Sequence, residues 1–169
     1  MAMFDRIRKI RSDQRGVAAI EFALWASLIG LPLIGGADFA LYSMSKLRLN
    51  NALGQGVIAA FQTREAVNVT TTRNIVTASW GNTPAVTVTV TCNGTASCVN
   101  TNRPCARITG WSAGAPQFTA VACNSGCVGN SCPGYFMTIR GEATYSSIIN
   151  NGRFTAPTQL DQSVTVALQ

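Results

Sequence analysis

No side chain between Phe22 and Ala37 carries a charge. Apolar residues continue on both sides of this run, through segments 17–20 and 39–42. About 20 apolar residues suffice to cross a bilayer as a helix, whereas a helix on a soluble domain normally keeps a polar face. The sequence therefore predicts a membrane-spanning helix over residues 17–42 rather than a buried core helix.

The segment before this run is basic, and its charge predicts the orientation of the chain. Its cations are Arg6, Arg8, Lys9, Arg11 and Arg15, offset only by Asp5 and Asp13. A basic segment directly before an apolar span is retained on the cytoplasmic side, so the residues after the span are translocated. We therefore expect a cytoplasmic N-terminus and a C-terminal domain on the other side of the membrane.

The composition argues against an enzyme. The chain has 169 residues, which is enough for one modest domain besides the span, and it contains no histidine. The usual general base, the usual metal ligand, and nucleophilic sites of the Ser-His-Asp or Cys-His type are thereby excluded. An acid pair drawn from Glu65, Glu142 and Asp161 is not indicated by their spacing. The sequence predicts a non-enzymatic protein without cofactor or metal.

Two acidic residues flank the apolar run, and only one of them is easily accommodated in a membrane. Asp38 can lie at the outer interface, but Glu21 follows four apolar residues and precedes more. A carboxylate within a span costs about 2.5–3.5 kcal/mol at the helix centre and less near the interfaces. The position of Glu21 therefore needs an explanation of its own.

A glycine ends the basic leader and a glutamate follows five positions later, in Arg15-Gly16-Val17-Ala18-Ala19-Ile20-Glu21-Phe22. This pattern resembles a prepilin peptidase site. The resemblance implies a cut between Gly16 and Val17 on the cytoplasmic side, with Glu21 as the fifth mature residue and Phe22 after it. The new amino group at Val17 would be cationic, with a reference pKa of about 7.7–8.0, and Glu21 lies about one helical turn away. Glu21 could pair with its own amino terminus or with that of a neighbouring subunit, and the sequence leaves both open.

The wider pattern resembles the TadE-like proteins of tight-adherence (Tad) pilus systems. It comprises Asp13-Gln14-Arg15-Gly16 before the span, Asp38-Phe39 at its far end, and Lys46–Ala52 beyond it. The resemblance implies a minor pilin or pseudopilin, processed by a prepilin peptidase and needed for pilus assembly. The partners it implies are that peptidase, other pilin and pseudopilin subunits, the inner-membrane assembly platform and the lipid bilayer. It implies a single-pass protein of the bacterial inner membrane with a periplasmic domain, or a subunit of the extracellular pilus.

Two other interpretations of the N-terminus remain open. Gly35-Gly36-Ala37 has the small residues of a conventional signal-peptidase site, and a cut there would release a soluble domain starting at Asp38. Alternatively, the chain is an uncleaved single-pass anchor. The first alternative would leave the spacing between Gly16 and Glu21 accidental.

Beyond the span, apolar residues recur at steps of three and four, which predicts that the helix continues as an amphipathic stem over residues 43–62. These residues are Leu41, Met44, Leu47, Ala52, Leu53, Val57 and Ile58. Their apolar stripe is expected to pack on the domain, and Gly54 and Gly56 are expected to weaken the helix. A short second helix is predicted over Thr72–Trp80.

The sequence after Trp80 is rich in strand patterns, most clearly over Ala85–Thr91, where Val and Thr alternate. Further strands are predicted over Phe118–Ala122, Phe136–Ala143 and Ser163–Leu168. The expected fold is therefore α+β, with a long membrane helix and stem packed on a small antiparallel sheet. The expected divisions are a leader over 1–16, the span over 17–42, the stem over 43–62 and the exported domain over 63–169.

All cysteines lie beyond the span, namely Cys92, Cys98, Cys105, Cys123, Cys127 and Cys132. On the exported side they meet an oxidising compartment, so structural disulfides in the loops are expected. Six cysteines allow fifteen pairings, which the sequence does not resolve. Three lie in each of two loop regions, so complete pairing requires at least one bond between the regions. A zinc site is the rival interpretation, but no C-x-x-C pair is present.

The aromatic residues of the loops allow a second function. Trp111, Phe118, Tyr135 and Phe136 are either core residues or part of an exposed binding surface. The alternative function is thus a surface-binding (adhesin) module mounted on a membrane or pilus anchor. Basic residues outnumber acidic ones beyond Asp38, but they are scattered along the sequence. This scatter favours a solvated surface, so nucleic acid is not expected as a partner.

Overall fold

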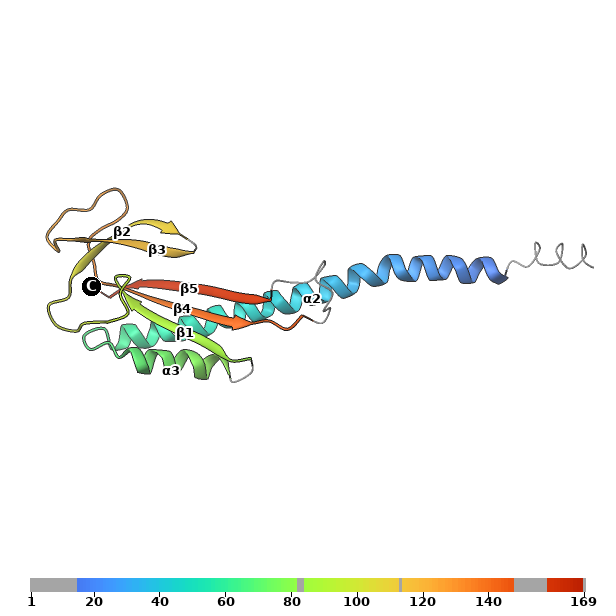
Figure 1. Cartoon of the computed structure of the whole chain (residues 1–169), viewed down its shortest axis with the longest axis horizontal. Coiled ribbons are helices and arrows are strands. Elements are labelled where there is room, and N and C mark those ends of the chain that lie inside the picture. The colour runs from blue at the N-terminus through green and yellow to red at the C-terminus, as the bar shows by residue number, and fades with distance from the viewer. Residues whose placement is uncertain (1–14, 82–83, 113, 148–157, 169) are drawn as a thin grey trace, which may run out of the picture.

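The computed structural model describes residues 15–81, 84–112, 114–147 and 158–168. Its elements are α2 (Arg15–Gln62), α3 (Val69–Trp80), β1 (Val86–Cys92), β2 (Cys105–Ser112), β3 (Ala115–Val121), β4 (Phe136–Thr144) and β5 (Gln159–Ala167). The N-terminal half of α2 extends away from the rest of the protein, and its C-terminal half lies along the domain (Figure 1). The predicted α+β fold, with a long N-terminal helix that continues from the apolar run into a stem, is confirmed.

The stem half of α2 buries one face against the domain. Leu49, Leu53 and Ala60 on this face are fully buried, at steps of four and seven residues that keep them on one side of a helix. The predicted stripe was only partly right, because Met44, Leu47 and Ile58 are 65%, 62% and 51% exposed. The stem is therefore apolar on two faces, of which the domain covers one.

Helix α3 packs beside the stem, and its start is set by a capping residue. The Asn68 side chain accepts a hydrogen bond from the Thr71 backbone N–H at 3.1 Å. Asparagine is a favoured N-cap because its side-chain oxygen satisfies an amide that the helix leaves without a partner. The helix thus begins three residues before the predicted Thr72 and ends at Trp80 as predicted.

Three antiparallel strands form the main sheet in the order β1-β4-β5. In β1 the predicted alternation is confirmed, because Val88 and Val90 are buried while Thr87 and Thr89 are exposed. Ile139 of β4 is also fully buried, and helices α2 and α3 cover this apolar face. The β4 prediction is confirmed, and β5 begins four residues earlier than predicted, at Gln159.

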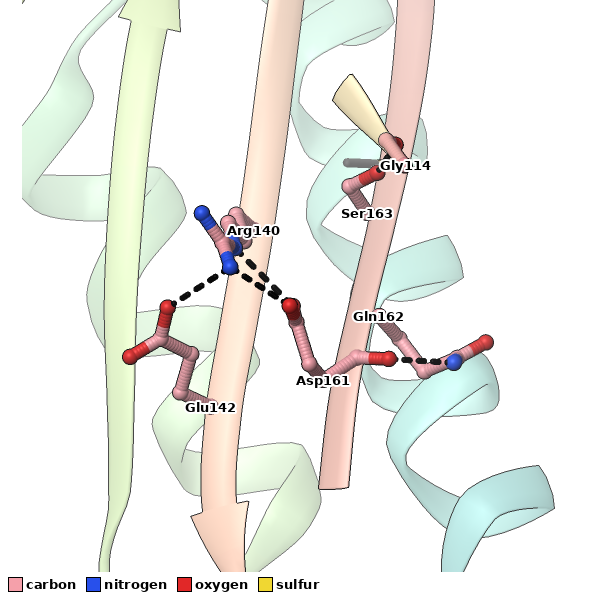
Figure 2. A network of polar contacts seen from close by, with 6 residues as sticks. All are labelled: Gly114, Arg140, Glu142, Asp161, Gln162 and Ser163. Atoms are coloured by element: carbon pink, nitrogen blue, oxygen red, sulfur yellow. Dashed lines mark hydrogen bonds and ion pairs between the residues drawn. The ribbon is translucent and has the colours of Figure 1, made fainter. Parts of the chain in front are cut away.

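A two-stranded antiparallel hairpin, β2-β3, forms a second sheet. Sequence patterns indicated only part of β3 and missed β2, where Gly110 and a register shift between Ile108 and Gly110 interrupt the alternation. At the hairpin turn Gly114 has a positive φ of 75°, which favours glycine. Ser163 of β5 donates a hydrogen bond to the Gly114 carbonyl at 2.8 Å, so the turn is fixed on the main sheet (Figure 2).

The expected disulfides are present as Cys92–Cys98, Cys105–Cys123 and Cys127–Cys132. The bond between Cys105 and Cys123 joins the two loop regions, as complete pairing requires. It also ties the open ends of β2 and β3 together, since Cys105 begins β2 and Cys123 follows β3. With all six sulfur atoms in disulfides, no thiolate remains to hold zinc.

Gly56 allows close packing of α2 against α3, so its replacement by alanine is expected to destabilise the domain. A Cβ atom there would lie 2.5 Å from Cγ2 of Val76 and 3.2 Å from Cδ1 of Ile139. Overpacking of this kind costs about 1–3 kcal/mol.

The matched control is Gly54→Ala, because a Cβ at Gly54 meets nothing within 4 Å. Alanine loses less conformational entropy than glycine when a helix forms, so this control should be more stable than the wild type by about 0.5–1 kcal/mol. Thermal unfolding of both variants in detergent checks the opposite signs, and equal effects would refute the packing role of Gly56.

Candidate functional site: the N-terminal helix and its junction with the domain

The N-terminal half of α2 is apolar and uncovered. No residue between Gly16 and Ala37 is buried, and Phe22, Leu31 and Leu33 are 74%, 75% and 67% exposed. Among the described residues, α2 is the one helix long and apolar enough to cross a membrane. At 1.5 Å per residue, the stretch from Gly16 to Ala37 is about 33 Å long, close to the roughly 30 Å of a hydrocarbon core. It fits a single-pass membrane protein.

Glu21 is the only acid or base in this stretch. Its side chain is exposed in the second turn of α2, and it makes no ion pair with any described side chain. Val17 lies four residues before it on the same side of the helix and is 63% exposed. The predicted cleavage residues Gly16 and Val17 and the motif residues Glu21 and Phe22 are thus all helical and accessible. Of the predicted leader, residues 1–14 lie outside the described residues.

Asp38 marks the point where the domain begins to cover the helix. Its side chain is 1% exposed, although it comes directly after the uncovered stretch. The carboxylate accepts hydrogen bonds from Tyr145 Oη at 3.0 Å and from Ser147 Oγ at 2.8 Å. The segment after β4 returns to the helix here and covers Asp38. A buried carboxylate needs such donors, since its desolvation is otherwise costly.

The Tyr145 side chain completes this junction. Its ring packs edge-on against Tyr42 of α2, with the centroids 5.5 Å apart. Burial raises the pKa of the Tyr145 phenol, and the hydrogen bond and negative charge of Asp38 raise it further. The phenol therefore stays protonated and donates its hydrogen bond to the Asp38 carboxylate. Together, Asp38, Tyr42, Tyr145 and Ser147 form the helix–domain junction, and sequence patterns gave no sign of their contact.

Two of the acids considered for an enzymatic pair belong instead to an ion-pair network on the open face of the sheet (Figure 2). Arg140 binds Asp161 through two hydrogen bonds of 2.9 and 2.5 Å and lies 3.1 Å from Glu142. All three side chains are at least 41% exposed. These contacts raise the pKa of Arg140, mainly through its hydrogen bond to Asp161. The network links β4 to β5 at the surface, and Glu65 lies elsewhere, in the lining of a pocket that also includes Arg64 and Arg103.

The aromatic residues of the loops divide between core and surface. Tyr135 is 1% exposed, and its hydroxyl accepts a hydrogen bond from the Val99 backbone N–H at 2.8 Å. Phe118 of β3 lies beside Phe136 of β4, with their centroids 5.7 Å apart, and both are half-buried. Trp111 of β2 differs, because it is 66% exposed. The core explanation is therefore correct for Tyr135, whereas Phe118 and Phe136 are half-buried outside the core and Trp111 is exposed at the surface.

Comparison with known proteins supports the importance of the N-terminal helix. Residues 16–57 match the family model of the TadE-like protein, which covers the uncovered stretch, the junction residue Asp38 and most of the stem. No curated protein and no solved structure gave a significant match. The TadE-like family is a structural family associated with Tad pili rather than a family of enzymes. Residues 16–57 of the chain, in the membrane helix and stem, are thus similar to TadE-like proteins.

Proposed function

We propose that the protein is a minor pilin or pseudopilin that contributes to assembly of a type IV-like Tad pilus. The observation that carries this proposal is the stretch Gly16–Ala37, which is apolar and uncovered and holds Glu21 as its single charge. A membrane anchor alone does not need a carboxylate within the membrane-spanning stretch, where the charge costs free energy in lipid. A subunit that pairs the Glu21 carboxylate with an amino terminus during assembly does need this charge.

We propose that a prepilin peptidase cleaves the chain between Gly16 and Val17. Cleavage there leaves the amino group of Val17 one turn from Glu21, at the start of a helix whose dipole also favours an anion. Signal-peptidase cleavage after Ala37 is less compatible with the fold. It would place a new charged amino group on Asp38, whose side chain is 1% exposed and bound by Tyr145 and Ser147.

A second apolar surface supports contact with other pilus subunits. Met44, Leu47, Ile58 and Phe61 lie on the face of the stem turned away from the domain and are 47–65% exposed. Their spacings of three and eleven residues correspond to about one and three helical turns, so they form one stripe. Outside a membrane such a stripe is poorly solvated, and helices of neighbouring subunits would cover it. We place this outer stripe in the pilus or in its assembly complex with the inner-membrane platform.

The orientation follows from the basic leader. With the cations before Gly16 on the cytoplasmic side, the domain lies in the periplasm of a bacterial cell until assembly. The oxidising periplasm also suits a domain with three disulfides.

The N-terminus of the mature protein tests this proposal directly. We expect mass spectrometry of the protein from a host with its native peptidase to find a chain that starts at Val17. Gly16→Ala should accumulate the uncut precursor, since the resemblance implies that the peptidase recognises the glycine before the cut. A mature chain starting at Asp38, or an uncut wild-type chain in cells that carry the peptidase, would overturn it.

The alternative function, a surface-binding module carried by the helix, has one observation in its favour. Trp111 is 66% exposed on the hairpin, although aromatic residues of this size are normally covered. This role is compatible with a pilus subunit.

A further inference from the structure

A groove runs between the β2-β3 hairpin and the loop that joins β3 to β4. Its volume is about 620 Å³, within the range of small-molecule sites, which runs from roughly 300 to 1,000 Å³. Trp111 and Val128 line it and are 66% and 64% exposed. Beyond α2, the large apolar side chains that are exposed among the described residues are these two and Val99. Two of the three therefore gather in a single groove.

The walls of this groove are held rigidly. The loop wall is closed by the Cys127–Cys132 disulfide, and Val128 and Ser131 exchange backbone hydrogen bonds of 3.0 and 3.1 Å within it. Ala106 of β2 and Gly134 exchange a further pair, of 2.8 and 3.0 Å, which joins the loop to the hairpin. A site whose walls are fixed before binding loses little conformational entropy when a ligand enters. Trp111 thus lies in a groove whose walls are already in place before a ligand binds.

The chemistry of the lining selects the kind of ligand. Asn130 and Ser131 line the groove with Trp111 and carry neutral amide and hydroxyl groups, whereas the Thr109 hydroxyl is already bonded to β3. No residue lining the groove, among those that the structure describes, is charged. This distinguishes the groove from the open face of the main sheet, where the Arg140 side chain is 41% exposed. A charged ligand would find no counter-charge here, and a purely apolar one would leave the Asn130 amide and the Ser131 hydroxyl without partners.

We infer that this groove binds an uncharged saccharide, with one sugar ring stacked on Trp111. A pyranose ring has an apolar face of C–H groups that packs on an aromatic ring, and hydroxyl groups at its edge that bond to amides and hydroxyls. Asn130, which can both donate and accept, is placed to bind those hydroxyls. The hairpin lies at the end of the molecule remote from Gly16, where a ligand on another surface can be reached (Figure 1).

Fluorine NMR of the full chain tests this inference. The protein has three tryptophans, so labelling with 5-fluorotryptophan in lipid nanodiscs gives one signal each for Trp25, Trp80 and Trp111. Single Trp→Phe variants assign them. The probes are maltose, cellobiose, lactose and N,N′-diacetylchitobiose, with sialyllactose as an anionic probe and an uncharged apolar hexapeptide as a protein-like one. We expect a saturable shift of the Trp111 signal with at least one neutral disaccharide. Trp80, which is 3% exposed, should not respond.

Matched variants separate stacking from nonspecific effects. Trp111→Ala should weaken the binding of the responding disaccharide roughly tenfold or more, as for a central aromatic contact. This is measured by calorimetry, and intact disulfides and an unchanged Tm establish that the variant is folded. Asn130→Ala should weaken binding severalfold, whereas Val99→Ala, exposed but outside the groove, should bind as the wild type does. Unchanged affinity in Trp111→Ala would remove the basis of the inference.

Three further results overturn it: no response of Trp111 to any neutral disaccharide, a response to sialyllactose alone, or a response to the hexapeptide alone. The last would assign the groove to a protein segment. The inference is independent of the proposed pilus role, because Trp111 is remote from the N-terminal helix. Trp111→Ala should therefore be cleaved and assembled like the wild type, and the failure of one proposal leaves the other intact.

Discussion

Replacement of Glu21 by alanine is expected to leave the chain cut at Val17 but to reduce its incorporation into pili at least roughly tenfold, which corresponds to a loss of about 1.4 kcal/mol. The reason is that Glu21 is the single charge of the uncovered stretch, so its removal leaves the cationic amino group of Val17 without a counter-charge. Amino-terminal mass spectrometry measures cleavage, and immunoblots of sheared pili against cell membranes measure incorporation.

Two control variants make this result specific. Leu24→Ala removes an apolar side chain that is 66% exposed in the same stretch, and Glu65→Ala removes an exposed acid of the domain. Both should assemble normally, because neither touches the proposed charge pair. Glu21→Asp, which keeps the charge on a shorter side chain, should restore part of the incorporation. Normal assembly of Glu21→Ala would show that charge pairing is not needed.

Replacement of Asp38 by alanine is expected to loosen the junction between helix and domain. The Tyr145 and Ser147 hydroxyls would lose a charged acceptor in a buried position, and hydrogen bonds to charged groups contribute about 1.5–3 kcal/mol each. We expect the Tm of the detergent-solubilised protein to fall by roughly 10 °C. Hydrogen exchange of peptides that cover residues 38–45 and 144–147 should accelerate, while peptides from β1 and α3 keep their protection.

Ser43→Ala is the matched control for this change. Its hydroxyl donates only to the Phe39 carbonyl of the same helix, at 3.0 Å, so its loss should leave both exchange and Tm nearly unchanged. Asp38→Asn, which keeps one acceptor oxygen, should lie between alanine and the wild type. Equal protection of residues 144–147 in Asp38→Ala and the wild type would refute the role of Asp38 in holding the junction.

The elements that the sequence predicted well are those whose local pattern and tertiary environment agree. The alternation of Val88 and Val90 with threonines matches a sheet covered on one face, and the apolar run before Ala37 matches an uncovered helix. The same reasoning misjudged the stem. Apolar spacing identifies a helix, but it does not decide whether Leu47 or Leu49 faces the domain when both faces are apolar. The sequence predicts only that Gly56 weakens the helix, because its role in close packing depends on the position of Val76 in another helix.

The junction and the groove were beyond prediction for a different reason. Asp38 accepts a hydrogen bond from Tyr145, which lies 107 residues further along the chain. Nothing in the local sequence of either residue specifies that contact, which arises only when β4 returns along the helix. The groove likewise depends on β2, a strand hidden by its irregular register, and on which of fifteen disulfide pairings forms. Long-range contacts of this kind follow from the assembled topology.

The coverage of Asp38 also determines how the domain can move. The uncovered stretch ends at Ala37 and the domain contacts the helix from the next residue, so no loop separates this stretch from the folded body. A change in the direction of the domain relative to the helix therefore requires either loss of the Asp38 contacts or a bend in the helix itself, which contains Pro32. While the Asp38 contacts hold and the helix stays straight, a rotation of the helix turns the domain and its hairpin with it. Extraction of the helix during assembly would therefore set the direction in which Trp111 points.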